Sequence, residues 1–129
     1  MSELSGNIDP TPYLYHYRCK VTDVYDGDTI RVIIDLGFGF KWHGVDSKEG
    51  MSIRLYGIDT PELRGDERER GLMVRDRLRE EILGKEITLK TIKDKTGKYG
   101  RYLGIIIKDD GTNINEWLVT EGLAERLIY

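Results

Sequence analysis

The chain has 129 residues and a formal net charge of −3, with 33% charged and 39% hydrophobic residues. This length supports one domain with a single hydrophobic core and requires no second domain. The mild negative charge excludes a protein that coats nucleic acid through bulk positive charge, because such proteins are strongly basic. An enzyme that acts on nucleic acid remains compatible with it, since acidic metal ligands contribute to the net charge.

The sequence contains no sign of export or of a membrane span. Cys19 is the single cysteine, so no disulfide can form within the chain. The polar segment 1–11 lacks the apolar run of a secretory signal, and no stretch approaches the ~20 apolar residues of a membrane helix. We therefore expect a soluble protein that is cytoplasmic or otherwise not exported by a conventional signal peptide.

The N-terminal segment differs from the rest of the chain. Residues 1–14 are predicted to form a flexible arm, and residues 15–129 a single domain. Within that domain, apolar and polar residues alternate over residues 15–22 and again over residues 30–36, the period of half-buried strands. An Asp-Gly turn joins them, which favours a tight hairpin. Asp26 and Asp28 are therefore expected at one end of this hairpin.

An aromatic segment follows the second strand. Phe38, Phe40 and Trp42 recur at every second position in a glycine-containing stretch, which predicts an extended β-hairpin insertion. Three aromatic side chains on one face could stack bases, form a contact with a second subunit, or fold back over the barrel. The sequence leaves these alternatives open, and the second would make the protein a homo-oligomer.

The next strand and loop carry more charged residues. Ile53 and Leu55 alternate with Arg54, so the arginine is expected to point away from the packed face of the strand. The loop at residues 59–62, Asp-Thr-Pro-Glu, follows closely, and its proline prevents simple continuation of the strand.

The second half of the chain predicts two helices and two strands. Apolar residues four apart indicate a helix over residues 67–83, and alternation indicates strands around residues 87–89 and over residues 102–107. An asparagine followed three residues later by a glutamate indicates a capped helix over residues 113–121. Five strands with two helices in this order predict an α+β, mainly β domain. We expect a small, closed or partly open antiparallel barrel of five strands, of the oligonucleotide-binding (OB) type, and the pattern alone leaves other α+β arrangements open.

The charged residues at the predicted strand ends combine two kinds of ligand. Asp28, Asp59 and Glu62 are hard oxygen donors of the kind that hold calcium or magnesium. Arg54 and Arg101 carry planar guanidinium groups that bind phosphate through two hydrogen bonds. A metal-assisted phosphodiesterase needs both kinds, because negative charge grows on the phosphate oxygens in the transition state.

Each of these residues also has an ordinary structural interpretation. An isolated Asp-Gly pair is most often only a turn, and an isolated arginine is most often solvated. The arginines between residues 64 and 79 alternate with acidic residues, which indicates a solvated helix face with ion pairs more than a phosphate track. The functional interpretation therefore depends on the ordered set of motifs.

That ordered set resembles the staphylococcal (thermonuclease-like) nuclease family, from about residue 17 to residue 127. The matching segments are residues 24–29, 54–55 with 59–62, 98–101, and 115–118 with 122–124. The resemblance implies an OB-fold nuclease that uses calcium to hydrolyse DNA and RNA. It also implies action on single-stranded or open regions with little sequence preference, which leaves 3′-phosphate ends.

The resemblance implies a role for each matching position. Asp28 and Asp59 would be the calcium carboxylates and Thr60 a backbone-carbonyl ligand, while Asp26 would act through a water molecule. Calcium is favoured over magnesium by such a loose set of carboxylates and carbonyls.

The resemblance also implies a substrate-binding set. Arg54 and Arg101 would bind the phosphate, and Lys98 and Tyr99 would contact a terminal phosphate or ring of the nucleotide. Glu62 would lie next to the attacking water. Whether it accepts a proton or only orients the water depends on its pKa and position, which the sequence leaves open.

The rival hypothesis from another class is a non-catalytic nucleic-acid-binding module of the same fold. Such modules arise when domains of this kind lose their charged residues. The charged set is complete here, and this favours the enzyme. Its members are Asp28, Arg54, Asp59, Glu62 and Arg101.

Overall fold

The computed structural model describes residues 6–44, 50–96 and 102–127. In chain order its strands and helices are β1 (His16–Asp26), β2 (Thr29–Gly37), β3 (Phe40–Trp42), β4 (Met51–Leu55), β5 (Ile58–Asp59), α1 (Arg68–Ile82), β6 (Glu86–Thr96), β7 (Tyr102–Ile107), α2 (Ile114–Thr120) and β8 (Glu125–Arg126). Short 3₁₀ turns lie at Thr11–Tyr13 and Gly65–Glu67. None of the helices in these ranges is both long and apolar enough to cross a membrane.

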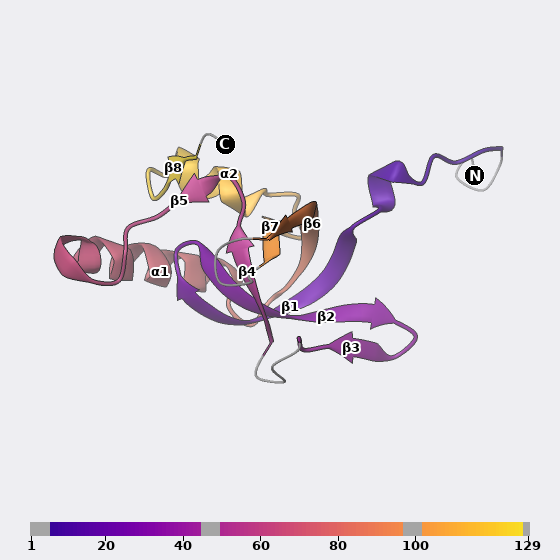
Figure 1. The fold of residues 1–129 in the computed structure, drawn as a ribbon, viewed down its shortest axis with the longest axis horizontal. Helices are drawn as coiled ribbons and strands as arrows, with labels where there is room; N and C mark the ends of the chain where they lie inside the picture. Colours follow the sequence, from indigo (N-terminus) through magenta and orange to yellow (C-terminus); the bar gives the residue numbers. More distant parts are fainter. Residues whose placement is uncertain (1–5, 45–49, 97–101, 128–129) are drawn as a thin grey trace.

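Five of these strands close into a barrel, around which the other elements are arranged (Figure 1). The strands pair in the order β1, β6, β7, β4, β2, and β2 pairs back with β1. The predicted OB-type barrel with two helices is therefore confirmed in the described part of the chain. The expectation of an entirely antiparallel barrel is wrong at one pair, because β4 and β7 run parallel. Between them the chain passes through α1 and β6, so β7 returns in the direction of β4.

The core lies inside the barrel and under α1. Inward-facing residues of the strands are fully buried, as the alternation predicts, and they include Ile30, Ile53 and Leu55. Helix α1 contributes Val74 and Leu78 from one face, and it lies beside the β1–β2 turn (Figure 1). The helix thereby packs against the end of the barrel that carries the acidic motif.

The aromatic hairpin extends from the opposite end of β2. Strand β3 pairs with the last residues of β2 and projects beyond the barrel (Figure 1). Phe38, Phe40 and Trp42 are 100%, 69% and 42% exposed, so the alternative in which they fold back over the barrel is wrong. Phe38 also lies in the turn, with φ of +55°, and not in the strand with the other two.

Asn115 connects three elements from a buried position on α2. Its amide group donates hydrogen bonds to the carbonyl oxygens of Tyr56 (2.9 Å) and Gly104 (3.1 Å). Its carbonyl oxygen accepts one from the backbone N–H of Ile106 at 3.1 Å. The side chain thus joins α2 to β7 and to the turn between β4 and β5. Asn113 caps the same helix by accepting from the N–H of Glu116 at 3.1 Å, as predicted.

We predict that Asn115→Leu, which keeps the branching and the number of side-chain heavy atoms, lowers the free energy of unfolding by about 2–4 kcal/mol. The change removes the partners of buried backbone groups and supplies no replacement. Asn113→Ala removes only a helix cap and should cost about 1 kcal/mol. Urea denaturation of both variants checks this, and equal losses would contradict the assignment of Asn115 as the main polar connection.

Candidate active site

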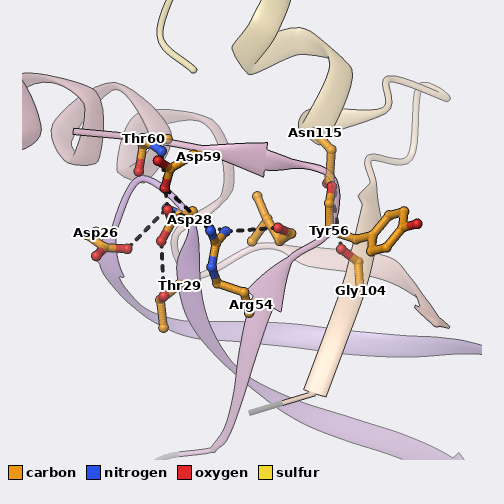
Figure 2. Close-up of polar contacts among 10 residues, drawn as sticks. Asp26, Asp28, Thr29, Arg54, Tyr56, Asp59, Thr60, Gly104 and Asn115 are labelled. Atoms are coloured by element: carbon orange, nitrogen blue, oxygen red, sulfur yellow. Dashed lines mark hydrogen bonds and ion pairs between the residues drawn. The ribbon is translucent and has the colours of Figure 1, made fainter. Parts of the chain in front are cut away.

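The β1–β2 turn places Asp28 at the centre of a polar network (Figure 2). Asp28 is only 7% exposed to solvent. One carboxylate oxygen accepts a hydrogen bond from the Thr29 hydroxyl at 3.2 Å, and the other accepts from the backbone N–H of Thr60 at 3.3 Å. Asp26 supports the turn, because its Oδ1 accepts from the N–H of Asp28 at 3.1 Å. The carboxylate is therefore held in one orientation between two loops.

Arg54, on β4, lies between two carboxylates (Figure 2). Its Nη1 is 3.3 Å from Asp28 Oδ2, and its Nη2 is 3.5 Å from Asp59 Oδ1. Nη1 also donates to the carbonyl oxygen of Leu55 at 3.0 Å. The Arg54 and Asp59 side chains are 15% and 56% exposed, so solvent reaches the group from the Asp59 side. The guanidinium is fixed in place and remains accessible on one side.

Two acidic residues at this site have pKa values above the usual range of an aspartate. Burial, and then the charge of Asp28, raise the pKa of Asp26 to about 7. Burial and the charge of Asp28 likewise raise the pKa of Asp59, although the Arg54 guanidinium acts in the opposite direction. Arg54 therefore compensates only part of the negative charge, which favours binding of a further cation.

The available donors suit a hard cation. Two carboxylates, Asp28 and Asp59, converge here, and the Thr60 hydroxyl is buried with no hydrogen-bond partner among the described residues. The described ranges hold no group of three or more acidic, His or Cys side chains placed to bind one ion. An ion would therefore depend on carbonyl and water oxygens as well, a shell that calcium accepts and zinc does not favour.

Two glycines let the loops of this site approach each other and α1. A Cβ on Gly27 would lie 2.6 Å from Val74 Cγ1 and 2.9 Å from Thr60 Cβ. A Cβ on Gly71, within α1, would overlap the carbonyl oxygen of Glu62. Glycine is therefore needed at both positions so that the two acidic loops can lie against the helix.

Arg79 provides a third contact between α1 and the site. Its Nε and Nη2 donate to the carbonyl oxygen of Val24 at 3.2 and 3.0 Å. This carbonyl lies beside the register shift between Val24 and Asp26 in β1, directly before the acidic turn. Sequence reasoning treated the arginines of this helix as a solvated face and missed this role. The glycine inside a predicted helix was the one available signal for close packing here.

The structure brings together most of the predicted site residues that it describes. Asp26, Asp28, Arg54, Asp59 and Thr60 form the connected network above. A cavity of about 220 Å³ opens beside Asp59 and Thr60 and is lined also by α1 and the segment before β8.

Of the remaining predicted residues, the structure describes Glu62. Glu62 is exposed in the adjoining loop, and its charge contributes to the raised pKa of Asp59. Lys98, Tyr99 and Arg101 lie outside the described residues.

We predict that Gly71→Ala destabilises the protein even though alanine is the better helix former by about 1 kcal/mol. The added methyl group must displace the backbone at Glu62, so the net loss should be about 1–3 kcal/mol. Glu69→Ala, at an exposed position of the same helix, is the matched control and should be nearly neutral. Urea denaturation checks both, and a Gly71→Ala variant as stable as the wild type would contradict the packing argument.

The raised pKa of Asp26 predicts how stability depends on pH in the presence of chelator. The folded state holds this proton more tightly than the unfolded chain, so the contribution is present at low pH and is lost as pH rises through about 7. Stability should fall by on the order of 1 kcal/mol between about pH 5 and pH 8, since solvent screens a partly buried carboxylate. Asp26→Asn keeps the side-chain oxygen that accepts from the N–H of Asp28, and it should make stability depend less on pH. If the wild type and this variant lost stability equally with pH, Asp26 would not be the titrating group.

Comparison with known proteins identifies the family. The sequence profile described as "Staphylococcal nuclease homologue" matches residues 52–129. Two curated proteins named "Uncharacterized endonuclease", from Escherichia coli O157:H7 and Escherichia coli, are each 33% identical to this chain over 105 residues. The alignment covers 81% of this chain and 58% of each relative, so the chain spans little more than half of their length. The family profile and the curated relatives both agree with the barrel fold described above. The chain therefore belongs to the family of staphylococcal nuclease homologues.

Proposed function

We propose that this protein is a calcium-dependent nuclease that hydrolyses phosphodiester bonds in DNA and RNA. It acts on single-stranded or open regions with little sequence preference and leaves 3′-phosphate ends. The observation that carries the proposal is the Arg54 guanidinium, fixed between Asp28 and Asp59 and open to solvent on one side. Membership of a nuclease family and relatives named endonucleases support it.

Asp28 and Asp59 would hold the calcium ion with the backbone carbonyl of Thr60, and Asp26 would act through water. Two observations support this assignment: burial and the charge of Asp28 raise the pKa of Asp59, and the buried Thr60 hydroxyl has no hydrogen-bond partner among the described residues. When bound, calcium would supply positive charge next to the phosphate oxygens. Its absence would leave Arg54 engaged by both carboxylates, so we expect the free protein to bind phosphate weakly.

Arg54 would bind a non-bridging phosphate oxygen. Its guanidinium is already oriented by Asp28 and by the Leu55 carbonyl, so little reorganisation accompanies the growth of charge on the phosphate. Arg101 would supply the second guanidinium. Two such groups stabilise the transition state more than the ground state, because they respond to the charge that develops during bond cleavage.

Glu62 would act on the attacking water. Its side chain is exposed beside the Asp59 loop, while its backbone rests against α1 at Gly71. A carboxylate on a loop supported in this way can orient a water molecule or accept its proton. Lys98 and Tyr99 would contact the nucleotide at a terminal phosphate or ring.

The test measures cleavage of labelled single-stranded DNA and RNA with calcium, with magnesium and with chelator. Arg54→Lys keeps the positive charge but loses the two-pronged geometry, and we expect about a 10²–10³-fold loss of kcat. Arg101→Ala should also abolish turnover with little change in Tm. The matched control is Arg18→Gln, because Arg18 forms ion pairs with Asp109 and Glu86 that do not involve the site.

The results separate the two function classes. Calcium-dependent cutting that is lost in Arg54→Lys and Arg101→Ala, and retained in Arg18→Gln, would support the nuclease. Salt-sensitive binding of the oligonucleotides without cutting would support the nucleic-acid-binding module instead. Activity per folded molecule retained in Arg101→Ala would refute the role given to that arginine.

A further inference from the structure

The β2–β3 hairpin exposes an unusual amount of apolar surface. Phe38 is 100% exposed, Phe40 69%, Leu36 50% and Trp42 42%. Single exposed apolar residues need no explanation, but a contiguous group on one projecting element indicates an interaction surface. This hairpin is remote from the acidic turn, because the two lie at opposite ends of β2 (Figure 1).

The hairpin is amphipathic. Trp42 pairs directly with Ile34, which is buried in the core, so Trp42 lies on the same face of the sheet. Phe40, two residues before Trp42, lies on that face as well. Asp35 and Lys41 pair with each other on the opposite face. The apolar face of the barrel interior therefore continues beyond the barrel, where nothing in the described residues covers it.

Charge argues against nucleic acid as the partner of this face. Surfaces that stack single-stranded bases combine aromatic residues with a positively charged groove. Here the face that carries Phe40 and Trp42 is apolar, and the Asp35–Lys41 pair, which has no net charge, lies on the opposite face. The nine residues of β2 also separate the hairpin from the Asp28 site by about 25 Å at the usual rise of a strand. A protein surface of similar apolar character fits the hairpin better.

A second copy of the chain supplies such a surface. We propose that two copies pack through the apolar faces of their β2–β3 hairpins and form a symmetric homodimer. A twofold contact places the same residues on both sides, so each aromatic group meets an apolar neighbour. The two Asp28 sites then face outward at the far ends of the dimer, and the proposal is independent of nuclease activity.

The available area is sufficient for a weak dimer. An aromatic side chain buries about 150–250 Å², so the exposed parts of Phe40 and Trp42, together with Phe38 in the turn of the hairpin, amount to roughly 400 Å² per copy. With Leu36, two copies reach about 1,000 Å², the lower limit of specific interfaces. The 6–15 arm leaves the same end of the barrel, because the start of β1 pairs with the end of β2, and its Tyr13 and Leu14 are also exposed. We therefore expect dissociation in the micromolar range.

Sedimentation equilibrium of the full chain, from about 1 to 300 μM, tests the proposal. The wild type should shift from monomer to dimer within this range. Phe40→Lys places like charges close together across the twofold axis and should weaken association by at least about 10-fold. The matched control is Met73→Lys on α1, an equally simple change of a 41% exposed apolar residue, which should not affect association. Circular dichroism verifies that the variants are folded, and Phe40→Ser replaces Phe40→Lys if they are not.

Three outcomes would overturn the proposal. A wild type that stays monomeric at about 300 μM would show that the hairpins do not form the proposed dimer with micromolar affinity. Equal association of wild type and Phe40→Lys, or equal weakening by Met73→Lys, would place any dimer contact elsewhere. A monomeric wild type whose tryptophan fluorescence is quenched by single-stranded DNA in chelator, with less quenching in Phe40→Ser, would assign the face to nucleic acid instead.

Discussion

The position of Arg54 between Asp28 and Asp59 is the interaction on which the site depends. Asp28 is almost completely buried, and an ionised carboxylate in that environment costs several kcal/mol unless it is compensated. Arg54 and the donors from Thr29 and Thr60 provide the compensation. The same contacts join β2, β4 and the loop after β5, so the charge balance of the site also connects these elements.

Compensation by one arginine is incomplete, and this incompleteness has a functional meaning. The raised pKa values of Asp26 and Asp59 come first from burial and then from the negative charge of Asp28. A site of this kind is stabilised by any bound cation, since the cation binds the folded state and not the unfolded one. The residues that destabilise the free protein are thus the ones that would give it affinity for a metal ion.

The sequence predicted the elements that depend on local pattern. Alternation located the barrel strands, four-residue spacing located α1, and Asn113 marked the start of α2. The parallel pairing of β4 and β7 was not predictable, because it depends on the path of the chain through α1 and β6. The members of the acidic network were predictable from the order of the motifs. The contacts between them were not, because they form only when the two acidic loops pack against α1.

Arg79 and Gly71 illustrate the limit most directly. A helix face with alternating charges ordinarily forms surface ion pairs, and Arg75 with Asp76 follows that rule. Arg79 instead donates two hydrogen bonds to a strand carbonyl, a partner that has no signature in sequence. The sequence pattern of a helix shows which side chains are polar, but it does not show which backbone groups they will hydrogen-bond in the folded protein.

Strand β2 joins two regions with different requirements. Its first residues belong to the acidic turn, where buried charge demands fixed geometry and glycine at close contacts. Its last residues belong to the hairpin, where exposed aromatic groups impose no such geometry on the barrel. The fully buried core residues Ile30 and Val32 lie between the hairpin and the charged site. The proposed dimer contact and the proposed chemistry therefore occupy separate regions of the fold, at opposite ends of β2.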